Sequence, residues 1–115
     1  MSRRVCFTLR VKPDLMDEYI ARHSPVWPEM LEEIAASGRR DYSIFHLGDG
    51  LLVGTYVTDD DAAAQEYLAR SEVAAQWEES MAPFFLGLDG RPDQAARTHP
   101  EVFHLETQLA AARAL

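Results

Sequence analysis

The chain has few of the features that tie a protein to disulfides, membranes or nucleic acids. Cys6 is its single cysteine, so neither an internal disulfide nor a cysteine-based metal cluster can form within one chain. Basic residues number 11 against 19 acidic ones, a formal net charge of -8, so no basic stripe is available for a phosphate backbone. No run approaches the roughly 18 apolar residues of a membrane span, and the start lacks the apolar stretch of a signal peptide. These absences predict a cytoplasmic protein with neither nucleic-acid nor membrane partners.

A hydrophobic core is nevertheless within reach of this chain. Its 115 residues are 47% hydrophobic, and a chain of this length buries enough surface to fold without disulfides or a structural metal. We expect one domain over residues 1–106. The alanine-rich residues 107–115 are expected to form a C-terminal tail, either helical or frayed.

Alternating apolar residues predict four strands. Residues 4–11 place Val5, Phe7 and Leu9 on one side of a strand, opposite Cys6 and Thr8. Residues 42–47 and 51–57 alternate in the same way on either side of a Gly-Asp-Gly turn, which predicts a β-hairpin. Residues 101–106 are expected to form the last strand, after an irregular connection over residues 86–100.

Two interrupted helices are expected between these strands. An apolar stripe over residues 15–23 predicts a helix that breaks at Ser24-Pro25 and resumes up to Gly38. Asp14 and Ser24 are the expected caps of these two pieces. Residues 59–61 place acidic charge at the start of a second helix, and Ser71 is expected to cap its continuation.

The order strand, helix, strand, strand, helix, strand predicts an α+β fold of the ferredoxin-like, split βαβ type. In this fold the helices cover one face of an antiparallel sheet. The other face would carry mixed polar and apolar residues, which suit a pocket or a second sheet better than bulk water. We therefore expect a homodimer of the dimeric α/β-barrel type.

One pair of side chains stands out as a candidate for chemistry. Tyr19 and His23 lie four residues apart on the first predicted helix, so a phenol and an imidazole share one face. The alternative is structural, with Tyr19 in the core and His23 bonded to a chain end at the helix break. The other histidines show no metal-ligand spacing, and no phosphate-binding loop, nucleotide fingerprint or serine elbow is present. No metal and no cofactor are predicted.

The segment EYIARHSPVWPE resembles the signature of the L-rhamnose mutarotase family. Its distinctive part is a tyrosine and a histidine one helical turn apart, followed by two prolines around a tryptophan: Tyr19, His23, Pro25, Trp27 and Pro28. Tyr42 in DYSIFHL, Trp77 in SEVAAQWEESM and the segment PEVFHLE continue the match in the family's order. The resemblance covers most of residues 3–106.

This resemblance implies a small dimeric protein that interconverts the α and β anomers of L-rhamnose, or of a related deoxy sugar, without a cofactor. It implies that His23 is the proton donor and that Tyr19, Tyr42 and Trp77 bind the monosaccharide. Many members carry a second tryptophan where this chain has Glu78, which leaves the identity of the sugar open. Glu78 is expected either to accept a sugar hydroxyl, to share in proton transfer, or to be a solvated helix carboxylate.

Two other functions remain compatible with the sequence. Small dimeric α+β barrel monooxygenases share the same topology, so the fold alone does not exclude them. A sugar-binding module that keeps the pocket but has no turnover is the second alternative.

Overall fold

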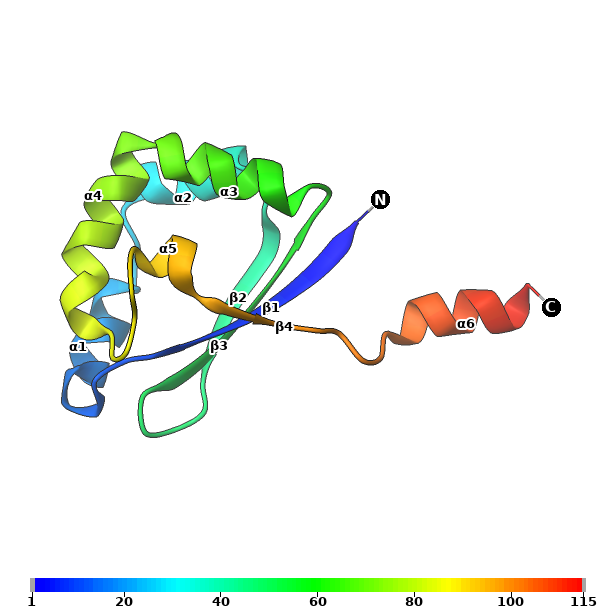
Figure 1. Ribbon diagram of the computed structural model, residues 1–115, viewed down its shortest axis with the longest axis horizontal. Coiled ribbons are helices and arrows are strands. Elements are labelled where there is room, and N and C mark those ends of the chain that lie inside the picture. Colours follow the sequence, from blue (N-terminus) through cyan, green and yellow to red (C-terminus); the bar gives the residue numbers. More distant parts are fainter. Residues whose placement is uncertain (1, 115) are drawn as a thin grey trace.

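The computed structural model describes residues 2–114 and shows an antiparallel sheet with helices on one face (Figure 1). The four strands are β1 (Arg3–Arg10), β2 (Arg40–His46), β3 (Leu51–Thr58) and β4 (Arg97–His99), in the spatial order β2-β3-β1-β4. This is the ferredoxin-like arrangement, and the predicted fold class is confirmed. The division into a domain over residues 1–106 and a tail over residues 107–115 stays a prediction.

The helices follow the predicted interruptions. In chain order they are η1 (Pro13–Leu15), α1 (Met16–Arg22), α2 (Pro28–Ala36), α3 (Asp61–Arg70), α4 (Glu72–Met81), η2 (Ala82–Phe84), α5 (Pro92–Ala95) and α6 (Leu105–Arg113). The Asp60 and Ser71 side chains accept hydrogen bonds from backbone amides and begin α3 and α4, as the sequence predicts. No helix within residues 2–114 is long and apolar enough to cross a membrane.

The expected caps of the first two helical pieces are wrong. The chain enters η1 at Pro13, and neither the cap of η1 at Lys12 nor that of α1 at Leu15 makes a side-chain cap hydrogen bond. The next helix, α2, begins at Pro28 rather than near Ser24, and its cap Trp27 offers no side-chain hydrogen bond either. In both places a proline opens the helix, because its fixed φ suits the first turn and it has no amide hydrogen to satisfy.

The last strand also differs from the prediction. Strand β4 spans Arg97–His99 and pairs with β1, whereas residues 101–104 are irregular and α6 follows. Pro100 explains the shift, because it has no amide hydrogen for the ladder. The connection over residues 86–100 is correspondingly less irregular than expected, since it contains α5 as well as β4. A four-residue helix is too short to leave a periodic signal in the sequence.

The inner face of the sheet packs against the helices. Val5 and Phe7 of β1 lie beside Tyr56 of β3, and all three are buried. Gly54 of β3 faces the Phe7 ring so closely that a Cβ there would lie 2.0 Å from a ring carbon. The absence of a side chain at position 54 therefore leaves room for the Phe7 ring over β3.

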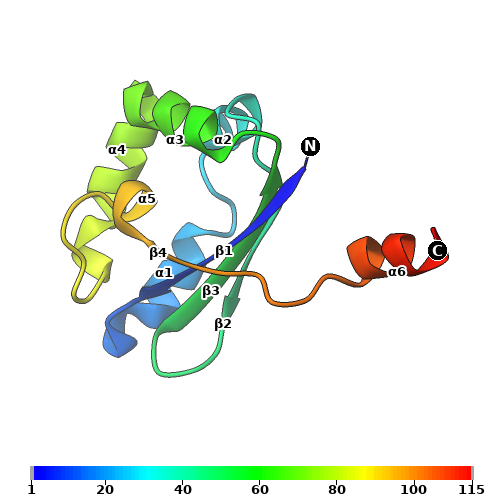
Figure 2. The ribbon, with the colours of Figure 1, turned by 45° about the vertical axis from the view of Figure 1, so that its right-hand side comes forward.

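The outer face of the sheet has no cover within the described chain. Phe45 of β2 and Leu47, which follows that strand, remain 58% and 61% exposed. Residues 102–114 extend away from the body as an arm that ends in α6 (Figures 1 and 2), after Glu101, which still pairs with Arg4 of β1. The radius of gyration is accordingly 15.5 Å, against roughly 13 Å for a compact domain of this length.

Candidate functional site

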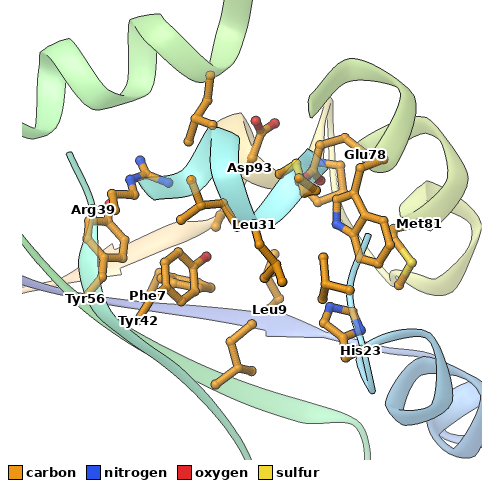
Figure 3. A pocket seen from close by; sticks show the side chains of 18 of the residues that line it. Phe7, Leu9, His23, Leu31, Arg39, Tyr42, Tyr56, Glu78, Met81 and Asp93 are labelled. Carbon is orange, nitrogen blue, oxygen red and sulfur yellow. The ribbon is translucent and has the colours of Figure 1, made fainter. Parts of the chain in front are cut away.

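A cavity of about 520 Å³ lies between the inner face of the sheet and the helices (Figure 3). This volume falls within the range of small-molecule sites. All five residues singled out from the sequence line it, although they come from three separate elements and one helix end: Tyr19, His23, Tyr42, Trp77 and Glu78. Their roles remain predictions, but the fold brings them together around one space.

His23 lies directly after α1, where the helix ends. Its Nδ1 lies 2.8 Å from the backbone oxygen of Tyr19. Because a carbonyl oxygen only accepts hydrogen bonds, Nδ1 carries the proton and Nε2 is the nitrogen left for a ligand. Burial lowers the pKa of His23, and the bond to the Tyr19 carbonyl opposes this shift. At neutral pH the imidazole is therefore mostly uncharged, with a free lone pair on Nε2.

Tyr19 is a core residue that also lies against His23. Its ring is 5% exposed and belongs to the main hydrophobic core, as the structural alternative predicts. The same ring stacks on His23 with centroids 4.1 Å apart, so it also fixes the plane of the imidazole. Burial raises the pKa of the phenol, which keeps it protonated and able to donate.

Trp77 of α4 forms an aromatic wall of the cavity. It is 6% exposed and meets His23 edge-on, with centroids 5.3 Å apart. Trp27 packs edge-on against its other side at 5.1 Å and is itself 38% exposed. Trp77 is thus both a core residue and part of the lining, whereas Trp27 supports it from outside.

Glu78 follows Trp77 on α4 and is buried at 7% exposure. It is therefore not the solvated helix carboxylate of the sequence-based alternative. Burial raises its pKa to about 8, with the negative charge of Asp93 as the next cause, while Arg91 acts in the opposite direction. At neutral pH the side chain is mostly a neutral carboxylic acid, which can donate a proton into the cavity.

Tyr42 enters the cavity from the sheet. A backbone irregularity between Arg40 and Ser43 breaks the register of β2 with β3, and Asp41 there has a φ of 51°. The Tyr42 ring stacks on Tyr56 at 5.3 Å and meets Phe7 edge-on at 5.9 Å. The irregularity shifts Arg40 and Asp41 relative to the rest of β2, whereas Tyr42 follows the alternation of the paired residues after it and lines the cavity together with Ile44.

Sequence analysis missed a polar group at the far end of the cavity. Arg39, Tyr56, Asp61 and Gln65 all line it there, and Tyr56 donates a 2.7 Å hydrogen bond to Asp61. Tyr56 could have been found from its alternation with Leu52 and Gly54 on one face of β3. Arg39 left no such signal, because an arginine after a helix-ending glycine is ordinarily solvated.

Within residues 2–114, no group of three or more histidine, cysteine, aspartate or glutamate side chains is arranged to hold a metal ion. The titratable side chains that line the described cavity include an imidazole, a neutral carboxylic acid and three phenols, which can transfer protons and form hydrogen bonds.

The sequence of the chain matches known proteins over nearly its whole length. The family model described as L-rhamnose mutarotase matches residues 4–105. The L-rhamnose mutarotase of Burkholderia orbicola is 36% identical over 105 residues, which cover 89% of this chain and 97% of that protein. That of Oceanobacillus iheyensis is 31% identical and covers 90% of this chain and 99% of its own length.

Solved structures agree with the fold. A crystal structure of L-rhamnose mutarotase from Formosa agariphila superposes with a TM-score of 0.71 at 25% identity, covering 89% of this chain and 97% of that one. A NIPSNAP family protein from Agrobacterium tumefaciens shares the fold alone, with a TM-score of 0.58 at 12% identity over 90% of this chain and 96% of its own. From the match over residues 4–105 and these relatives, the chain belongs to the L-rhamnose mutarotase family.

Proposed function

We propose that the protein is an aldose mutarotase that interconverts the α and β anomers of L-rhamnose or a related deoxy sugar. One observation supports this assignment beyond family membership. A single cavity brings the free Nε2 of His23 together with the aromatic wall of Trp77 and the neutral acid of Glu78. Mutarotation requires a proton acceptor and a proton donor beside the anomeric centre, and this cavity offers both.

The reaction opens and recloses the sugar ring. In our proposal His23 Nε2 takes the proton of the anomeric hydroxyl while Glu78 gives its proton to the ring oxygen, which breaks the bond from that oxygen to the anomeric carbon. The products are an open-chain aldehyde, an imidazolium and a carboxylate. After the aldehyde group rotates, the ring-forming hydroxyl of the sugar attacks the other face of the aldehyde carbon and gives its proton to Glu78. At the same time the aldehyde oxygen, which becomes the anomeric hydroxyl, receives a proton from His23. His23 is thus the proton donor of the closing step, and both groups end as they began.

The remaining residues that we assign to the site bind the sugar. Trp77 offers an apolar surface for the C–H face of a deoxy sugar. Tyr19 and Tyr42 line the same cavity and have hydroxyls that can hold ring hydroxyls. Together they would keep the anomeric carbon beside His23 and leave proton transfer as the only chemical task.

Two-dimensional exchange NMR of L-rhamnose at anomeric equilibrium tests this function. The protein should accelerate exchange between the α and β signals above the rate in buffer, and a panel of aldoses would identify the preferred sugar. Sugar signals that broaden without faster exchange would indicate the binding module instead. Oxygen uptake with a quinol or haem substrate would indicate the monooxygenase, which family membership does not favour.

We also propose that the protein works as a cytoplasmic homodimer. The single cysteine suits a reducing compartment. Apolar residues are uncovered on the outer face of the sheet and on the arm, where Val102 and Phe103 are 91% and 62% exposed. Both surfaces are typical of sites that another chain covers. A second copy related by a two-fold axis would cover both surfaces at once, with sheet against sheet and each arm on its neighbour.

The oligomeric state can be checked by light scattering after size exclusion. The wild type should elute as a dimer, whereas Phe45→Glu should shift it towards a monomer because it buries a charge in the sheet-to-sheet contact. Ile20→Glu is the matched control, since Ile20 is 49% exposed on the helical side. A monomeric wild type, or an equal shift in both variants, would contradict the proposed interface.

A further inference from the structure

The far end of the cavity is built around a buried arginine. Arg39 lies just after α2 and is 6% exposed, although arginine is rarely so buried. Its guanidinium stacks on the Tyr56 ring, 4.3 Å from the ring centroid. Figure 3 shows Arg39 and His23 on opposite sides of the cavity, with Tyr42 and Leu31 between them in this view.

The guanidinium has N–H groups that the described chain does not use. Its hydrogen bonds to described residues both start from Nη2, which donates to Asp61 at 3.5 Å and to Gln65. Nε is buried and has no partner among the described residues. Arg39 lines the cavity, and neither its Nε nor its Nη1 has a partner among the described residues, so this geometry points to an acceptor that enters the cavity.

The charges around Arg39 favour a neutral acceptor over an anion. Asp61 already balances the guanidinium charge. Asp93 lines the same cavity and is paired with Arg91 at 2.6 Å. Glu78 is mostly neutral at pH 7, and an anion beside it would raise its pKa further, so it would offer that anion no positive charge. A ligand carboxylate would therefore meet no excess of positive charge, whereas a hydroxyl oxygen needs none.

We propose that Arg39 determines sugar specificity by donating a hydrogen bond to a hydroxyl oxygen on the side of the sugar remote from the anomeric carbon. The inference rests on the proposed function, because His23 at one end fixes where the anomeric carbon lies. The hydroxyls on C3 and C4 lie across the ring from that end. Arg39 then acts on substrate choice, while proton transfer stays with His23 and Glu78.

The experiment compares L-rhamnose with its 3-deoxy and 4-deoxy analogues. Binding is measured by saturation-transfer difference NMR with titration, and turnover by anomer exchange, for the wild type and for Arg39→Met. The wild type should bind at least one deoxy analogue roughly 10- to 100-fold more weakly than L-rhamnose, the range for a hydrogen bond to a charged group. Arg39→Met should bind that analogue and L-rhamnose alike. Arg70→Met is the matched control, since Arg70 makes only an exposed ion pair with Glu66 among described residues.

Each outcome decides the proposal. The proposal is overturned if Arg39→Met keeps the wild-type preference, if the wild type binds all three sugars alike or not at all, or if a hexuronate binds more tightly than the neutral sugar. Circular dichroism checks the fold of Arg39→Met. If that variant does not fold, Arg39→Lys replaces it in the experiment; lysine keeps the charge but not the planar fork, so this variant should lose most of the preference. If the protein shows the Arg39-dependent binding preference but does not accelerate anomer exchange, the mutarotase function alone is refuted. If it accelerates exchange but the preference does not depend on Arg39, only the role of Arg39 is refuted.

Discussion

Replacing His23 by alanine should slow the exchange of L-rhamnose anomers by roughly a hundredfold or more while the protein stays folded. The imidazole supplies the proton acceptor for ring opening and the donor for ring closure, and a positioned acid or base typically contributes a factor of this size. Its only hydrogen bond to a described residue is the one from Nδ1 to the Tyr19 carbonyl, so its loss removes little from the fold. Exchange NMR measures the rate, and circular dichroism the fold.

Two further variants separate chemistry from structure. His23→Asn can keep a donor near the Tyr19 carbonyl but has no Nε2, so it should be as slow as the alanine variant. His46→Ala is the histidine control, because His46 accepts a hydrogen bond from the Gly50 amide and does not line the cavity. Near-normal exchange in a folded His23→Asn would remove the imidazole from the mechanism.

Replacing Glu78 by glutamine should change the pH profile of exchange as well as its rate. In the wild type, exchange should fall on the alkaline side with an apparent pKa near 8, where Glu78 loses the proton it donates. On the acid side it should fall as His23 becomes protonated, at a pKa that burial holds below the usual value. Glu78→Gln should lower the rate by roughly a hundredfold at pH 7 and remove the alkaline limb. A variant with an unchanged alkaline limb would assign that limb to another group.

The same substitution should stabilise the protein. Glu78 titrates near 4.5 when unfolded and at about 8 when folded, so folding at pH 7 requires it to take up a proton. This uptake lowers the free energy of unfolding by roughly 3 kcal/mol, a penalty that grows from pH 4.5 to pH 8 and is absent below pH 4.5. Glu78→Gln removes the penalty, because glutamine is always neutral. Denaturant unfolding at pH 4 and pH 8 should therefore show a gain only at pH 8, and Glu79→Gln, an exposed neighbour, should show little gain at either pH.

Local patterns predicted most of the fold, because β1, the hairpin and the helix starts at Asp60 and Ser71 each depend on neighbouring residues. The last strand was misplaced because its pairing depends on β1, some ninety residues away, and on Pro100, which ends the ladder. A three-residue strand carries no periodicity of its own. Pairing between strands that are far apart in the chain is difficult to predict from a single sequence.

For the site too, local spacing was informative, whereas long-range contacts were not predicted. The spacing of Tyr19 and His23 predicted that the two side chains share a helix face, and in the structure their rings stack. The burial of Glu78, and with it the shift of its pKa, could not be predicted from the sequence, because two consecutive glutamates on a helix are typical of a solvated surface. Arg39 was missed because its guanidinium is held by residues distant in sequence, Tyr56 of β3 and Asp61 and Gln65 of α3.

Gly54 has a consequence for how this scaffold could be adapted to other sugars. Any larger residue there would push the Phe7 ring off the sheet and into the space where the ligand is proposed to lie. The depth of the cavity on the sheet side therefore depends on Gly54, which has no side chain and determines where the Phe7 ring can lie. Adjusting that one position would tune ligand size without disturbing the groups that move protons.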